Sequence, residues 1–98
     1  MFLKNKMIYR RRFLPEIKLI NRILKGKLIG YWERYYRNGN LSSKGSYNND
    51  GQEIGYWEYY YYNGNLELKG NYDNGNVVGD WHHFNEDGSL KEIINHDN

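Results

Sequence analysis

The stretch Gly55-Tyr-Trp-Glu-Tyr-Tyr-Tyr-Tyr-Asn-Gly64 decides the fold, because a related stretch lies on each side of it. Gly30-Tyr-Trp-Glu-Arg-Tyr-Tyr-Arg-Asn-Gly39 precedes it, and Gly79-Asp-Trp-His-His-Phe-Asn-Glu-Asp-Gly88 follows it. The leading glycines are 25 residues apart from 30 to 55 and 24 residues apart from 55 to 79, and a leucine follows two residues after each closing glycine. Similarity at a fixed period indicates a chain built from repeated units.

Each unit is predicted to be a β-hairpin. Asn38-Gly39, Asn63-Gly64 and Asp87-Gly88 favour tight turns with positive φ, whose twist matches that of antiparallel strands. The strand that returns from the first turn alternates in character from Leu41 to Tyr47, which predicts one apolar and one polar face. In the outgoing strand Trp32 and Tyr35 have opposite parity, so we expect a bulge that brings both rings to the same side.

A degenerate unit is predicted before residue 30. Gly26 and Gly30 have the spacing of Gly51 and Gly55, and a step back of 24 residues places Ile8 in the tryptophan column. A helix over residues 15–25 is the alternative, with Pro15 at its first position and Gly26 as its stop. The two-residue rhythm of Ile17, Leu19 and Ile23 favours strands instead.

These units predict an all-β protein with one domain over residues 1–98. Hairpins joined end to end form a single elongated antiparallel meander of about eight strands. The basic first unit covers residues 1–29, and the recognisable units cover residues 30–54, 55–78 and 79–98. The outermost strands are open edges, which the basic first unit and the charged tail at residues 95–98 are expected to blunt.

Composition and charge narrow the functional classes. The chain has no cysteine, so disulfides and thiolate metal sites are excluded and a cytoplasmic location is expected. No apolar run has the length of a secretory leader or a membrane span, since Lys4, Lys6 and Arg10 interrupt the N-terminal region. The net charge of +2 hides a division, because residues 1–27 hold nine bases and one acid while the remainder holds five bases and eleven acids.

The recurrent pattern Gly-x-Trp-x-x-Tyr-Tyr-x-x-Gly-x-Leu, followed by Gly-x-Tyr and a further glycine, resembles the MORN repeat in its longer bacterial variant. The resemblance covers residues 26–94 and extends loosely over residues 6–25. Ile94 in place of glycine and His96 in place of tyrosine depart from it. The resemblance implies a rolled sheet of stacked hairpins and a role in contacts with proteins or sometimes lipids, and bacterial members are often labelled antitoxins.

The aromatic residues are expected to divide between scaffold and surface. The column formed by Trp32, Trp57 and Trp81 recurs in register with the hairpins, so we interpret it as the ladder that fills the inner face rather than a stacking platform for ligands. Six tyrosines exceed what the repeat requires and are predicted to bind a partner, although β-propensity on a solvated face would also explain them. They are Tyr31, Tyr36, Tyr56, Tyr59, Tyr61 and Tyr62.

The basic N-terminal end is a second predicted contact region, carried by Arg10, Arg11 and Arg12. Arginines interleaved with aromatic residues could contact nucleic acid or an anionic membrane. The acidic remainder would repel a long polyanion, which makes nucleic acid the weaker hypothesis. An acidic protein partner or the acidic half of another copy fits equally well.

No catalytic, metal or cofactor site is predicted. His82 and His83 are adjacent, so they should lie on opposite faces of a strand and cannot converge on one ion. Glu33 and Glu58 share a column with one strand between them, which predicts a separation of about 10 Å on a solvated face. The glycines end hairpins and match no phosphate-binding fingerprint.

The sequence therefore predicts a non-enzymatic protein-binding module of the inhibitor, antitoxin or immunity type, which binds its partner through an aromatic sheet face. One alternative is a protein that sequesters a nucleotide or another small molecule in an aromatic groove. Another is a membrane-surface tether that acts through the basic first unit. Association of copies through the open sheet edges is compatible with each of them.

Overall fold

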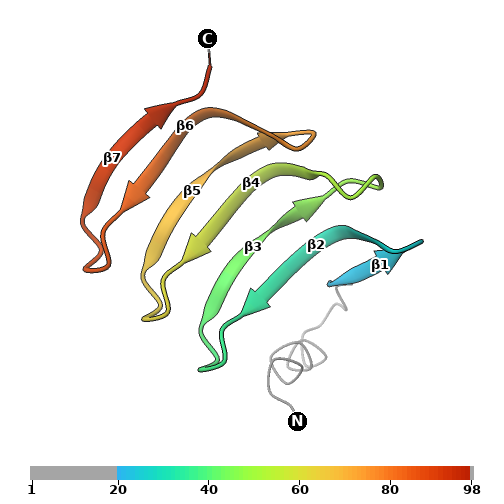
Figure 1. The fold of residues 1–98 in the computed structure, drawn as a ribbon, viewed down its shortest axis with the longest axis horizontal. Helices are drawn as coiled ribbons and strands as arrows, with labels where there is room; N and C mark the ends of the chain where they lie inside the picture. The colour runs from blue at the N-terminus through green and yellow to red at the C-terminus, as the bar shows by residue number, and fades with distance from the viewer. Residues whose placement is uncertain (1–19, 98) are drawn as a thin grey trace, which may run out of the picture.

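The computed structural model describes residues 20–97, which form one open antiparallel sheet of seven strands in chain order (Figure 1). The strands are β1 (Arg22–Leu24), β2 (Lys27–Tyr35), β3 (Leu41–Tyr47), β4 (Glu53–Tyr60), β5 (Leu66–Asp73), β6 (Asn76–Phe84) and β7 (Leu90–Asn95). The predicted all-β meander of stacked hairpins is confirmed, and the recognisable units are β2 with β3, β4 with β5, and β6 with β7. No helix in residues 20–97 is long and apolar enough to cross a membrane.

The N-terminal predictions are tested only in part. Residues 22–24 form β1, and Lys25 and Gly26 have φ of 50° and 81° in the turn that follows. The alternative of a helix that continues to residue 25 is therefore wrong for the part of it that the structure describes. The placements of Ile8, Pro15 and Ile17 lie outside the described residues.

The hairpins occur where the dipeptides predicted them, with a longer loop. The amide of Gly39 donates to the carbonyl of Tyr36 at 2.9 Å, and the amide of Tyr36 donates to the carbonyl of Asn40 at 2.8 Å. Gly39 has a φ of 93° while Asn38 has no positive φ, so the loop is a three-residue turn that closes on a left-handed glycine. Two-residue turns occur at Lys25-Gly26 and Asn74-Gly75, where both φ values are positive.

Within the β2–β3 hairpin the bulge lies on the returning strand, and a further irregularity occurs on the outgoing strand β4 where it pairs with β3. Arg34 pairs with Ser43 and Tyr35 pairs with Leu41, so Ser42 is the extra residue. From Trp32 to Tyr35 the outgoing strand keeps its regular alternation, which leaves Tyr35 on the face opposite Trp32. The expectation that a bulge brings the two rings to the same side is wrong. We call the two sides of the sheet the tryptophan face and the glutamate face, after Trp57 and Glu58.

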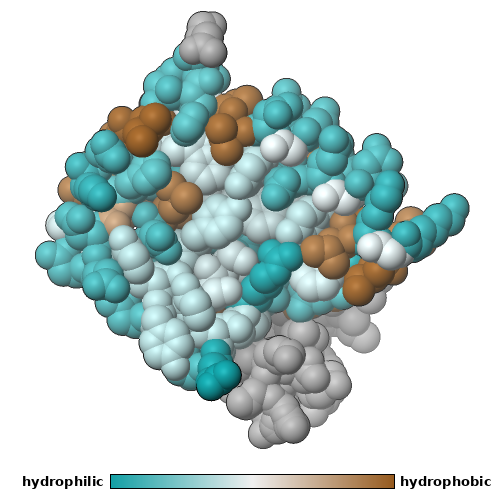
Figure 2. All heavy atoms as spheres, viewed as in Figure 1, coloured by the Kyte–Doolittle hydropathy of each residue, from teal (hydrophilic) through white to brown (hydrophobic). Residues whose placement is uncertain are grey.

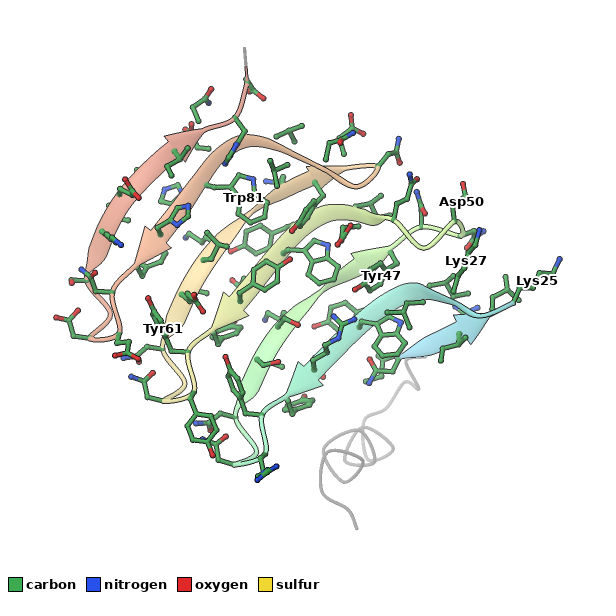
Figure 3. All side chains as sticks on the ribbon, viewed as in Figure 1. Lys25, Lys27, Tyr47, Asp50, Tyr61 and Trp81 are labelled. Atoms are coloured by element: carbon green, nitrogen blue, oxygen red, sulfur yellow. The ribbon has the colours of Figure 1, made fainter. Side chains whose placement is uncertain are left out.

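The tryptophan column is the core of the sheet, as predicted. Trp57 is 1% exposed, and a Cβ placed on Gly45 would lie 2.0 Å from Cδ2 of its indole. Its Nε1 donates to the carbonyl of Ser46 at 3.1 Å, and the ring of Tyr47 packs edge-on at 5.1 Å. Gly70 makes the same space for Trp81, which is seen with Tyr47 on the near side of the sheet in Figure 3. The unit of β2 with β3 and the unit of β4 with β5 therefore each receive the tryptophan of the next unit over a glycine.

Candidate protein-binding surface

The six predicted tyrosines do not share one surface. Tyr31 and Tyr56 lie on the glutamate face, and Tyr59 lies on the tryptophan face. Tyr36, Tyr61 and Tyr62 lie along the margin formed by the loops at residues 36–40, 61–65 and 85–89, which we call the turn margin (Figure 1). A single aromatic strip made from all six residues is therefore not formed. The other predicted contact residues, Arg10, Arg11 and Arg12, lie outside the described part of the chain.

Tyr59 belongs to the scaffold. Its ring stacks on Trp57 at 5.9 Å with an interplanar angle of 21°. Its hydroxyl shares a 2.8 Å hydrogen bond with the hydroxyl of Tyr72, and burial together with that bond raises the pKa of Tyr59. A substitution at Tyr59 would disturb the core of the sheet as well as any surface contact.

The glutamate face carries a cluster built around Glu58. The hydroxyl of Tyr56 donates to Oε2 of Glu58 at 2.7 Å, the hydroxyl of Tyr60 donates to Oε1, and Nζ of Lys44 lies 3.4 Å from Oε1. Burial acts to raise the pKa of Glu58, but the hydrogen bonds from Tyr60 and Tyr56 and the charge of Lys44 outweigh it and lower the pKa. The carboxylate therefore holds the two tyrosine rings in place.

The same arrangement occurs in the preceding unit. The hydroxyls of Tyr31 and Tyr35 donate to the carboxylate of Glu33 at 2.9 and 2.7 Å, and Glu33 is 8% exposed. The prediction that these glutamates simply lie on a solvated face is wrong, because tyrosine side chains cover and bind them. The sequence contained a signal, since Tyr-x-Glu-x-Tyr places three side chains on one side of a strand.

At the turn margin two tyrosines brace neighbouring units. The hydroxyl of Tyr36 donates to the carbonyl of Tyr60, and the hydroxyl of Tyr61 donates to the carbonyl of Phe84 at 2.7 Å. The carbonyl of Tyr62 accepts the side-chain amides of Asn38 and Asn40 at 2.9 and 3.0 Å. The backbone of each loop is thus fixed by the loop beside it.

Two of the predicted tyrosines combine wide exposure with a fixed position. Tyr56 is 50% exposed and its hydroxyl is held by Glu58, while Tyr62 is 56% exposed and its ring packs against Tyr36 at 5.2 Å. Partial burial and the neighbouring Glu58 raise the pKa of Tyr56 to about 12, so its hydroxyl is a donor across the physiological range. These two residues are the remaining candidates for aromatic contacts with a partner.

Arg34 is a surface group that the sequence reasoning missed. Its guanidinium lies 5.6 Å from the ring centre of Trp32 and 5.8 Å from that of Tyr47, and its Nη2 donates to the hydroxyl of Tyr47 at 2.9 Å. It therefore stands as a fixed, exposed cation on aromatic rings of the tryptophan face. Figure 2 shows this side of the sheet, where a broad pale area is bordered by hydrophilic residues. The sequence held a signal for this role of Arg34, because Arg34 lies two residues after Trp32, just as Tyr59 lies two residues after Trp57 in the next unit.

The two adjacent histidines of β6 lie on opposite faces of the sheet. His82 stacks with Phe84 on the glutamate face, and His83 pairs with Leu68 on the other face, as expected from their adjacency. Within this part of the chain no three His, Cys, Asp or Glu residues are placed to hold a metal ion.

One open sheet of hairpins, in which Trp57 and Trp81 each pack over a glycine of the preceding unit, defines a β-hairpin repeat protein. Residues 28–49 and 53–74, which include β2 with β3 and β4 with β5, match the family model of the MORN repeat variant. These two hairpin units are MORN repeats of the variant type, which confirms the resemblance seen in the sequence. Repeats of this kind are commonly binding modules. Comparison with curated proteins and with solved structures gave no match.

Proposed function

We propose that this protein is a non-enzymatic protein-binding module that acts as an inhibitor, antitoxin or immunity-type protein by occupying the surface of a partner. The observation that supports the proposal is the pair of exposed, fixed tyrosines. Tyr56 is held by Glu58 through a 2.7 Å hydrogen bond, and Tyr62 is held through its carbonyl and its ring. Neither ring is needed to fill the tryptophan face.

Fixed tyrosines suit protein binding for an energetic reason. Ordering a free side chain at an interface costs about 0.5–1.5 kcal/mol, and a ring that is already held avoids part of that cost. Tyrosine also offers a large apolar area and a hydroxyl on one short side chain, which is why it is frequent among residues that dominate binding energy. The sheet presents these rings on a backbone that neighbouring units hold in place.

The test compares wild type with the double variant Tyr56→Ala, Tyr62→Ala. Proteins that copurify with tagged wild type from its native cell are identified, and the affinity of each purified candidate is measured by calorimetry. We expect the double variant to bind its partner roughly tenfold more weakly or worse, because residues of this type often contribute 2 kcal/mol or more. Val77→Ala, at an exposed position opposite Tyr72 on the other face of the sheet from Tyr56, is the matched control and should bind like wild type.

Two outcomes would contradict the proposal. Unchanged affinity in a double variant with a normal β circular dichroism spectrum would reject the assigned surface. The inhibitory role is checked separately by measuring the partner's activity or toxicity with and without the protein. A partner that remains fully active when saturated would reject inhibition while leaving binding intact.

A further inference from the structure

Within residues 20–97 the two edge strands of the sheet are unequal. β1 is only three residues long and lies beside the basic residues Lys25 and Lys27. β7 is six residues long and exposed throughout, with Ile93 at 49% and Ile94 at 37% exposure. A long apolar edge strand with unpaired backbone groups is a site for pairing with another strand, and proteins usually protect such edges. β7 has no proline and carries one lysine, so it is the less protected edge.

Ile94 decides which strand can pair there. It stands opposite Trp81, at the position that glycine occupies opposite Trp32 and Trp57. In those units the glycine leaves room for the tryptophan of the following unit. The side chain of Ile94 fills this room, so a further unit of the same pattern cannot pack its tryptophan over β7. The partner strand must lack a tryptophan at that point.

The backbone of β7 fixes which residues would pair. The amide of His96 donates to the carbonyl of Gly79 at 2.9 Å, so His96 directs its backbone groups toward β6. Backbone direction alternates along a strand, and Ile94 therefore also faces β6. Ile93 and Asn95 direct their amide and carbonyl groups to the open side.

We propose that β7 pairs antiparallel with β7 of a second copy of this chain, with the two-fold axis at Ile94. This register places Ile94 opposite Ile94 of the second copy on the tryptophan face, and Glu92 opposite His96 of the second copy. The outward-facing Ile93 and Asn95 then form the backbone hydrogen bonds. The two sheets continue as one across the interface, and the exposed isoleucines become covered.

Charge and polarity select this register among its neighbours. With the axis at Ile93, the carboxylate of Glu92 lies opposite the apolar Ile94. With the axis at Asn95, Ile93 lies opposite the carboxylate of Asp97. With the axis at Glu92, two like charges face each other, which is destabilising. The axis at Ile94 pairs Ile94 with Ile94 and Ile93 with Asn95, and among these registers it alone sets the carboxylate of Glu92 against an imidazole donor.

Disulfide trapping tests the register, because the chain has no cysteine of its own. In the proposed pair the Cα atoms at position 94 are about 4.5 Å apart, which is within disulfide range. Mild oxidation of Ile94→Cys should therefore give a covalent dimer on a non-reducing gel. Glu92→Cys is the matched control on the same strand and face, and its two copies would be about 13 Å apart. Equal cross-linking at both positions, or none at position 94 with a reactive thiol, overturns the proposal.

Light scattering during gel filtration tests the association itself. Wild type should elute with the mass of two chains, and Ile94→Lys should elute with the mass of one chain, because two lysines would meet at the axis. An unchanged β circular dichroism spectrum shows that the variant is folded. A one-chain wild type at high micromolar concentration, or an Ile94→Lys variant that keeps the two-chain mass, rejects the interface. The proposal is independent of the tyrosine surface, so either can fail alone.

Discussion

At the scale of single residues, the carboxylate of Glu58 stabilises the glutamate face by binding tyrosine hydroxyls. A carboxylate on a strand of a single-layer sheet would ordinarily be hydrated, yet Glu58 receives two tyrosine hydroxyls and lies 3.4 Å from Lys44. Hydrogen bonds to an ionised group are stronger than neutral ones, at about 1.5–3 kcal/mol. The charge is therefore part of the packing of the glutamate face.

Glu58→Gln should make the stability of the protein less dependent on pH. The folded pKa of Glu58 is lowered, so its contribution is present at neutral pH and is lost as the pH falls below the ordinary glutamate value of about 4.3. The variant should be less stable than wild type by about 1 kcal/mol at pH 7, and the gap should close near pH 3. Urea unfolding of both proteins at both pH values measures this difference in the free energy of unfolding. A gap that stays constant contradicts the role of the charge, and Glu86→Gln at an exposed turn is the control.

At the scale of the elements, neighbouring hairpins are joined by more than the sheet hydrogen bonds. Tyr36 reaches the carbonyl of Tyr60 in the next unit, and Tyr61 repeats this contact with Phe84. Asn63 and Asn65 both donate to the carbonyl of Glu86 at 3.0 and 2.8 Å. The loops of the turn margin thus form a second ladder beside the sheet.

Tyr61→Phe should measurably destabilise the protein, because it removes one hydrogen bond between units and leaves the carbonyl of Phe84 without that donor. The ring and its packing are kept. Tyr62→Phe is the matched control at the next residue, where the ring is half exposed, and it should change the free energy of unfolding by less than about 0.5 kcal/mol. Equal effects of the two substitutions in urea unfolding would contradict the second ladder.

The elements also show how far sequence reasoning reaches. Repeated Gly, Trp and Asn-Gly positions predicted the hairpins, their order and the buried tryptophan column, because each of these residues has a local or steric reason to stand where it does. The extra residue of the bulge gave no such signal, since Ser42 is an ordinary strand residue. Unless the position of the bulge is known, the sequence does not tell on which face of the sheet Tyr35 and Tyr59 lie. The scaffold role of Tyr59 therefore became visible only in the three-dimensional contacts.

At the scale of the whole molecule, the protein is a one-dimensional array. In the described part of the chain every strand pairs only with its neighbours in the sequence, from β1 to β7. The stability of such an array is approximately the sum of the stabilities of its units and of the interfaces between neighbours. A defect at one interface should therefore act mainly on the units next to it.

Gly70→Ala should release the last unit before the others. The new Cβ would lie 2.1 Å from Cδ2 of Trp81, so the indole must move away from β5. Such overpacking typically costs about 1–3 kcal/mol, and this cost falls on the contact between β5 and β6. Amide hydrogen exchange should then be faster by roughly tenfold or more in β6, while β3 keeps its wild-type protection. Asn71→Ala, at the next and exposed position of β5, is the control and should leave both strands unchanged. If β3 and β6 lose protection equally, the sheet opens as one cooperative unit and the array description is wrong.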